Sequence, residues 1–271
     1  MRLILFYLLI LLCLPFTNTA QSKLGDVASI YVTTSNLDSS LSFYEKLGFT
    51  KKAANEYPVP WVQVSDGSLL VTMRKDNTPY IGLTYYMSDP ESLVATLEKD
   101  SIVFIQKPKA GDFIQRYLFK TPEGFNIVLS NNPGGFVQPA GPTLLTMKPA
   151  DYTDPEKYPN KLCGAFGEFA YPVSNLAASL RFWKKLGFAV KSEMKSPYPH
   201  AILSDGLMII GLHQATHFNY PAITYFGIKT ADRISQLKKN GLQSFTEMGG
   251  KTNVILQTWE GQHFFIFSLG M

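Results

Sequence analysis

The residues best suited to chemistry lie in the second half of this 271-residue sequence. Its four histidines are all there: His200, His213, His217 and His263. A carboxylate, Glu168, stands nearby in the run Gly167 to Tyr171. Imidazole and carboxylate groups bind divalent metal ions, and they also exchange protons near neutral pH. The second half is therefore where a metal site or an acid–base pair is expected.

Strand alternation predicts which of these side chains share a face, because successive residues of a strand point to opposite sides. In the strand-like run 208–213, apolar residues form one face and His213 belongs to the other. The same parity separates His200 from its apolar neighbours and places His263 on a face with two phenylalanines. His217 is expected in an exposed loop. Four side chains are thus expected to converge: Glu168, His200, His213 and His263.

Each of these residues also has a structural explanation. Glu168 can be a hydrogen-bonding residue at a domain edge, with Tyr171, Lys161 or the backbone as its partner. His200 stands near a strand start and can be a surface residue, whereas His263 follows a turn and can be a structural polar residue. A carboxylate on a sheet face is costly unless it is paired, metal-bound or functional. Glu168 therefore has the strongest case for a role in a site.

An internal repeat predicts the elements that position these side chains. The stretch SNLDSSLSFYEKLGF at 35–49 returns as SNLAASLRFWKKLGF at 174–188, with ten identical residues and a constant offset of 139 positions. Ser-Asn favours a helix N-cap, apolar residues follow on one helical face, and the glycines Gly48 and Gly187 favour a helix stop. A β-rich run precedes the first copy. The phrase therefore predicts a strand followed by a short amphipathic helix.

Further strands follow each copy of this phrase. Two strand-like runs, 61–64 and 69–74, flank the turn Ser65-Asp66-Gly67, which recurs 139 positions later. A weaker echo of the unit follows, in which a Glu-Gly turn, Glu123-Gly124 or Glu260-Gly261, leads into the last strand. The sequence therefore predicts an α+β fold of four βαβββ modules in two pairs.

These motifs resemble the vicinal oxygen chelate superfamily, which includes glyoxalase I, bleomycin-resistance proteins, fosfomycin-modifying enzymes and extradiol dioxygenases. The resemblance rests on the repeated Asn-Leu-x-x-Ser-Leu-x-Phe-(Tyr/Trp)-x-Lys-Leu-Gly-Phe and on the closing Glu-Gly turns. It implies that two modules form one domain whose mixed sheet curls into a cup that holds a ligand or metal. The four-module form is similar in architecture to extradiol dioxygenases. Architecture alone does not assign chemistry.

The resemblance also implies where metal ligands would stand. In the first domain the four family positions hold poor ligands: Ser29, Thr72, Gly82 and Val128. In the second domain the first position is Glu168, but the other three are again poor ligands: Gly211, Ala222 and Phe265. Glu168 and His213 are therefore the candidate metal ligands, and a divalent metal is one alternative for an unknown cofactor.

The cup of the first domain is expected to have an aromatic and polar lining with one guanidinium group: Tyr31, Trp61, Gln63, Thr72, Arg74, Tyr86 and Asn126. Such a lining suits an aromatic or anionic small molecule. The alternative is that each is an ordinary residue of a half-buried sheet.

Two function classes stay open. In the first, the protein binds a small organic molecule without catalysis, as the resemblance to bleomycin-resistance proteins implies. The candidate binding residues are His200, His263, Tyr31, Trp61 and Arg74. In the alternative, the second domain is a lyase, isomerase or dioxygenase in which Glu168 is the base or ligand and His213 the acid or ligand. The scarcity of ligand side chains favours a binding protein or a metal-free enzyme.

The N-terminal residues and the composition limit where the protein can be located and which partners it can bind. Residues 1–20 have the layout of a secretory signal peptide, with an apolar run too short for a membrane span of about 20 residues. We therefore expect a periplasmic or extracellular protein without a stable membrane span. Cys163 is then the only cysteine, so no internal disulfide forms. The net charge of +4 comes with scattered lysines, so nucleic acid is not expected as a partner.

The organisation expected for the mature chain has three parts: a first domain at 24–131, a Pro- and Gly-rich surface linker at 132–164, and a second domain at 165–271. A monomer with two paired domains, binding a small-molecule ligand or substrate, is the expected assembly.

Overall fold

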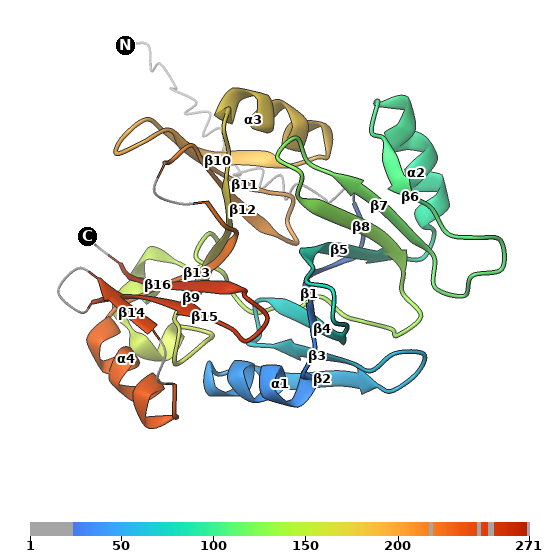
Figure 1. The fold of residues 1–271 in the computed structure, drawn as a ribbon. Helices are drawn as coiled ribbons and strands as arrows, with labels where there is room; N and C mark the ends of the chain where they lie inside the picture. The colour runs from blue at the N-terminus through green and yellow to red at the C-terminus, as the bar shows by residue number, and fades with distance from the viewer. Residues whose placement is uncertain (1–23, 217–218, 243–244, 249–251, 270–271) are drawn as a thin grey trace, which may run out of the picture.

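Two eight-stranded mixed sheets, one from each half of the chain, form the molecule (Figure 1). The computed structural model describes residues 24–216, 219–242, 245–248 and 252–269. The expected signal peptide and His217 lie outside the described residues. Within these described ranges, no helix has both the length and the apolar character needed to cross a membrane.

The first sheet has the strand order β2-β3-β4-β1-β5-β8-β7-β6. Parallel pairs β1–β4 and β5–β8 belong to its two modules, and the antiparallel pair β1–β5 joins the modules. Its elements are β1 (Val27–Thr34), α1 (Leu37–Lys46), β2 (Thr50–Asn55), β3 (Trp61–Ser65), β4 (Leu70–Lys75), β5 (Ile81–Met87), α2 (Pro90–Lys99), β6 (Phe104–Gln106), β7 (Arg116–Lys120) and β8 (Asn126–Asn131).

The second sheet repeats this plan in the order β10-β11-β12-β9-β13-β16-β15-β14. Its elements are β9 (Ala165–Pro172), α3 (Leu176–Lys185), β10 (Ala189–Met194), β11 (His200–Ser204), β12 (Ile209–His213), β13 (Ala222–Gly227), α4 (Thr230–Lys239), β14 (Phe245–Met248), β15 (Asn253–Gln257) and β16 (His263–Ser268). The predicted α+β fold of four paired βαβββ modules is confirmed.

The repeated phrase forms α1 and α3, as predicted. The side chains of Asn36 and Asn175 each accept a hydrogen bond at 3.0 Å from the backbone N–H three residues later. Gly48 and Gly187 follow the helices with φ of 90° and 94°, a left-handed conformation that favours glycine. Local chemistry therefore determines where both helices begin and end.

One continuous hydrophobic cluster joins the two halves. Tyr44 on α1 meets Phe264 on β16, with ring centroids 5.6 Å apart. Phe125, just before β8, meets Tyr171 on β9 at 4.1 Å. Each half therefore contributes aromatic side chains to the core of the other, and we call this shared region the seam.

Hydrogen bonds related by the repeat also cross the seam. The hydroxyl of Ser40 on α1 donates to the carboxylate of Glu260 at 2.9 Å, and the hydroxyl of Ser179 on α3 donates to Glu123 in the same way. Both glutamates belong to the closing Glu-Gly turns of the opposite half. The serine of the repeated phrase thus docks one half on the other, in addition to its place in a helix.

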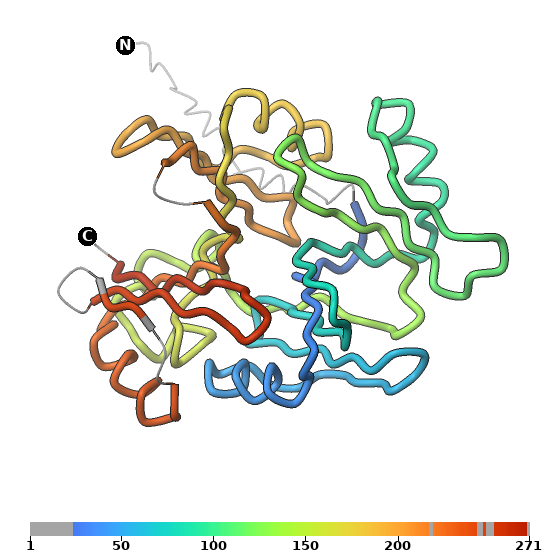
Figure 2. Tube along the Cα trace, viewed as in Figure 1, coloured from blue at the N-terminus to red at the C-terminus, as the bar shows by residue number. Residues whose placement is uncertain are grey.

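The segment between the sheets differs from the expected surface linker. It crosses from the first sheet to the second (Figure 2) and contains two short 3-10 helices, Pro149–Thr153 and Pro155–Lys157. Asn160 and Cys163 are buried in it, and the Asn160 amide donates to the carbonyl of Leu47 at 3.0 Å. The carbonyls at the end of α1 lack helical partners, and this segment supplies one. The boundaries 24–131 and 165–271 stay a prediction.

The contact between Tyr225 and Asp66 tests the contribution of the seam to stability. The buried Tyr225 hydroxyl donates to the Asp66 carboxylate at 2.5 Å. Tyr225→Phe keeps the ring and removes this bond, so we expect the free energy of unfolding in urea to fall by about 1.5–3 kcal/mol. Tyr57→Phe, the same change on an exposed ring, is the control. Equal effects of the two substitutions would contradict a stabilising seam.

Candidate functional site

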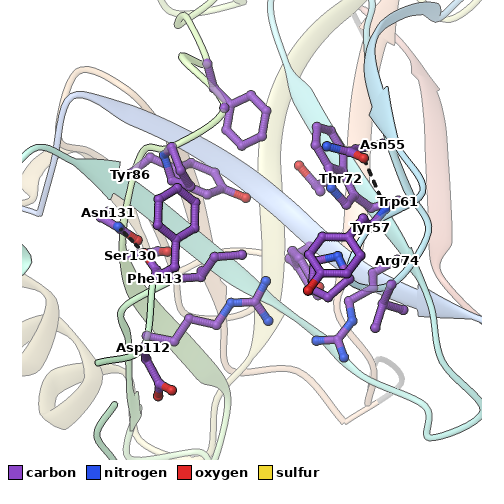
Figure 3. Close-up of a pocket in the computed structure, with 18 residues that line it drawn as sticks. Asn55, Tyr57, Trp61, Thr72, Arg74, Tyr86, Asp112, Phe113, Ser130 and Asn131 are labelled. Carbon is purple, nitrogen blue, oxygen red and sulfur yellow. Dashed lines mark hydrogen bonds between the residues drawn. The ribbon is translucent and has the colours of Figure 1, made fainter. Parts of the chain in front are cut away.

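A cavity of about 600 Å³ opens in the cup of the first sheet. Its walls come from the central strands, from the loop between β6 and β7, and from the segment after β8. Figure 3 shows Trp61, Tyr57 and Arg74 on one side of it and Tyr86 and Phe113 on the other. Its volume is in the range of small-molecule sites.

Aromatic rings make up much of the cavity wall. Phe136, from the segment after β8, packs edge to face on Trp61 at 5.3 Å and on Tyr86 at 4.8 Å between ring centroids. Tyr57 and Phe113 also line the cavity, and they remain 81% and 78% exposed. Large aromatic side chains left open to solvent around a cavity offer a surface for an apolar ligand.

Two arginines bring positive charge to the same cavity. The Arg116 guanidinium lies 5.6 Å from the centre of the Tyr31 ring, and Arg74 forms a 3.8 Å ion pair with Asp76. Arg74 Nε and the Tyr31 hydroxyl are buried, and neither has a hydrogen-bond partner within the described part of the chain. Buried polar groups without partners are costly. Both therefore suit an acceptor that a ligand would bring.

The lining of this cavity is poorly suited to proton transfer. Asp112 is the only carboxylate among the described lining residues, and it accepts a hydrogen bond from the backbone N–H of Lys109 at 2.7 Å. The hydroxyls of Ser29 and Thr72 lie 2.9 Å apart, and the Gln63 amide donates to Thr72 at 3.1 Å. These polar groups of the first cup therefore satisfy one another.

The second cup holds a buried carboxylate–imidazole pair. Nε2 of His213 lies 2.9 Å from Oε1 of Glu168, and the two residues are 9% and 5% exposed. Gly211 makes room for them, because a Cβ at this position would lie 1.8 Å from Glu168 Oε2. The structure therefore brings together the two residues that the sequence singled out for catalysis.

Two further rings surround His213. The Tyr198 hydroxyl lies 3.3 Å from His213 Nδ1, and the His200 ring is parallel to the His213 ring with centroids 5.7 Å apart. Burial, followed by the negative charge of Glu168, raises the pKa of Tyr198. The group thus contains three residues that the sequence predicted, Glu168, His200 and His213. It also contains Tyr198, which the sequence did not indicate.

The repeat relates the two cups residue by residue. The offset of 139 positions pairs Ser29 with Glu168 and Arg74 with His213, each on equivalent strands. Equivalent positions therefore hold a hydroxyl and a guanidinium in one cup, and a carboxylate and an imidazole in the other.

Two predicted residues make contacts that differ from those expected. The ring of His263 stacks on Tyr220 with centroids 3.7 Å apart, and burial lowers the pKa of His263. Asn126 was expected in the first cup, but it lines a separate cleft of about 390 Å³ between the halves. Asn126 is the first residue of β8, so it lies at the end of the strand that faces the second half.

Several lining residues of the first cup were missed in the sequence: Tyr57, Phe113, Arg116 and Phe136. Most lie in loops, where no periodic pattern marks a side chain that points into a cavity. Arg116 is the exception, because it alternates with the buried residues Tyr117 and Phe119 along β7. Strand parity was therefore sufficient to identify it.

The described residues do not fit a resident metal ion. Metal sites built from side chains use at least three nitrogen, oxygen or sulfur donors. No three His, Cys, Asp or Glu side chains gather in a suitable group in the described ranges. Glu168 and His213 supply two donors that bond to each other. Their assignment as metal ligands stays a prediction, and no reaction step is derived through a metal.

Neither a protein-family model nor a curated protein matches this sequence. Solved structures do match its fold. The 2,3-dioxygenase LapB from Pseudomonas sp. KL28 is 14% identical with a TM-score of 0.55, over 93% of this chain and 94% of that chain. Homoprotocatechuate 2,3-dioxygenase from Arthrobacter globiformis is 13% identical with a TM-score of 0.56, over 94% and 84% of the chains.

A third structure, BphC, a halotolerant catechol dioxygenase, is 11% identical with a TM-score of 0.53, over 92% of this chain and 89% of that chain. Identities this low concern the fold and not the reaction. The chain therefore has the two-domain fold of the vicinal oxygen chelate superfamily, in the four-module form of its extradiol dioxygenases.

Proposed function

We propose that this protein binds a small aromatic anion in the cavity of the first cup. The observation that carries the proposal is the pair of buried polar groups, Arg74 Nε and the Tyr31 hydroxyl, without partners in the described residues and next to an aromatic wall. A ligand with an aromatic ring and a carboxylate satisfies both features. Its ring covers the wall, and its carboxylate accepts the free hydrogen bonds.

The charge of the cavity favours a carboxylate over a neutral polar group. Arg74 and Arg116 both line it, and the guanidinium fork matches the two oxygens of a carboxylate. The Arg74–Asp76 pair is 3.8 Å long and half-exposed, so it leaves Arg74 free to bind a second anion. Two of the structural neighbours are named for homoprotocatechuate and catechol, which supports an aromatic ligand class.

The proposal extends to location and assembly. The signal-peptide layout of residues 1–20 supports an exported, periplasmic or extracellular binder. The continuous core across the seam supports a monomer in which the two halves pair within one chain.

The enzyme alternative belongs to the second cup. The observation that favours it is the buried Glu168–His213 contact of 2.9 Å, a pairing suited to proton transfer. A lyase, isomerase or dioxygenase reaction stays the alternative to pure binding.

Removing the guanidinium should weaken binding of an aromatic carboxylate selectively. A hydrogen bond to a charged group contributes about 1.5–3 kcal/mol, which corresponds to about a tenfold to hundredfold change in Kd. We therefore expect Arg74→Gln to raise the Kd of phenylacetate by about that factor in isothermal titration calorimetry. The Kd of the uncharged analogue phenylacetamide should change little.

The control is Lys75→Gln, which makes the same charge change on the next, exposed residue of β4. It should leave phenylacetate binding unchanged. Equal losses in the two variants would show a general charge effect, and an equal affinity of the wild type for phenylacetate and phenylacetamide would contradict recognition of an anion.

Ligand binding should also be visible in tryptophan fluorescence. Trp61 lines the cavity, whereas Trp259 is exposed and does not belong to the lining. Phenylacetate is expected to change the emission of the wild type and of Trp259→Phe, but not that of Trp61→Phe. A full response in Trp61→Phe would place the ligand elsewhere.

A further inference from the structure

A hydrogen-bonded row of three side chains crosses the second cup. Oε1 of Glu168 lies 2.9 Å from Nε2 of His213, and Nδ1 of His213 lies 3.3 Å from the Tyr198 hydroxyl. When Glu168 is ionised, its carboxylate accepts a hydrogen bond from Nε2 of His213. Nδ1 of a neutral imidazole is then an acceptor for the Tyr198 hydroxyl. The row is therefore arranged to pass a proton from phenol to imidazole.

The row has a buried end and an accessible end. Glu168 and His213 are buried, whereas Tyr198 is half-buried in the connection between β10 and β11. Its hydroxyl lies 3.3 Å from His213 Nδ1, within reach of the imidazole. Tyr198 is thus the member of the row that is most exposed to solvent.

Neighbouring residues hold the row in place. Gly211 leaves the space that the Glu168 carboxylate occupies, since a Cβ would approach it to 1.8 Å. The His200 ring lies parallel to His213, and its Nδ1 is 2.8 Å from the backbone carbonyl oxygen of Tyr198. Both the imidazole plane and the backbone of the phenol are therefore supported.

The first cup shows that the fold does not require this row. The three equivalent positions, 139 residues earlier, hold Ser29, Arg74 and Val59. The β1–β4 pairing nevertheless has the same register as the β9–β12 pairing, whereas β9 has an irregularity against β13 beside Glu168 that β1 lacks against β5. A buried carboxylate is costly to maintain. Its presence in one of two equivalent cups therefore indicates a function specific to the second.

We propose that Tyr198, His213 and Glu168 form a proton relay, independent of a metal ion, that acts on a weak O–H or C–H acid bound in the second cup. The acidic bond of the bound molecule breaks, and its proton joins Tyr198 Oη. The proton of the phenol moves to Nδ1 of His213, and Glu168 stabilises the resulting imidazolium. The electron pair stays on the bound molecule as an oxyanion or enolate, and the reverse step returns the proton.

In this relay Tyr198 is the catalytic residue, and His213 and Glu168 act through it. The inference concerns a site separate from the aromatic cavity of the first cup. Loss of binding in the first cup would leave it intact.

The relay predicts a reactive Tyr198 hydroxyl. N-acetylimidazole acetylates tyrosine hydroxyls, and base assistance should make Tyr198 react about tenfold or more faster than Tyr57. Exposure alone predicts the reverse order, because Tyr57 is 81% exposed and Tyr198 is half-buried. Peptide mass spectrometry of the acetylated full chain measures both rates in one sample. A slower Tyr198 would overturn the proposal.

Two variants test whether the row causes the reactivity of the Tyr198 hydroxyl. His213→Gln and Glu168→Gln should each slow acetylation of Tyr198 about tenfold or more and leave Tyr57 unchanged. An unchanged Tyr198 rate in a folded variant would overturn the relay. EDTA should leave the wild-type rate unaltered, and a loss in EDTA would overturn its independence of metal.

A measurement on the wild type keeps the test valid if the variants do not fold. Nitrogen-15 NMR of the His213 ring should show the proton on Nε2 at neutral pH, because the relay needs Nε2 as the donor to Glu168 and Nδ1 as the acceptor. A proton on Nδ1 would prevent this nitrogen from accepting the proton of Tyr198 and would overturn the relay.

Discussion

The seam between the two halves is the constraint on which the rest of the structure depends. Ser40 of α1 binds Glu260 of the opposite half, and Ser179 of α3 binds Glu123 in the same way. Aromatic contacts such as Tyr44–Phe264 surround these bonds. The two sheets therefore share one core, and each half needs the closing turn of the other to bury its helix. The repeated phrase has a physical role in the seam, because its serines and its aromatic residue Tyr44 make contacts across it.

Within this frame the two cups can diverge in chemistry. The pairs β1–β4 and β9–β12 have the same register, so a side chain on the concave face changes the contents of a cup and leaves the core intact. The first cup has aromatic walls with guanidinium groups, which suits an aromatic anion. The second cup has a buried carboxylate next to an imidazole, a pair that suits proton transfer. One fold thus holds two cups with different side chains, and its architecture alone does not determine their chemistry.

The features that depend on local periodicity could be predicted from the sequence. The repeat predicted the modules, and strand parity placed His213 on the face that it shares with Glu168. Sequence reasoning missed β2 (Thr50–Asn55), which is an exposed polar edge strand without an alternating pattern. It also missed Phe136 and Tyr198, because their positions depend on how connecting segments fold back on a sheet. The bond between Ser40 and Glu260 spans 220 residues, and no local signal in the sequence predicts such a pairing.

A crystal structure of the protein with 4-bromobenzoate tests most directly whether the first cup binds an aromatic anion. Anomalous scattering from bromine locates the ring without reference to the surrounding density. If the first cup binds aromatic anions, we expect a bromine peak among Trp61, Tyr86 and Phe136, with the carboxylate bound to Arg74. A peak next to His213 with an empty first cup, or no peak in the first cup at a saturating concentration, would contradict it.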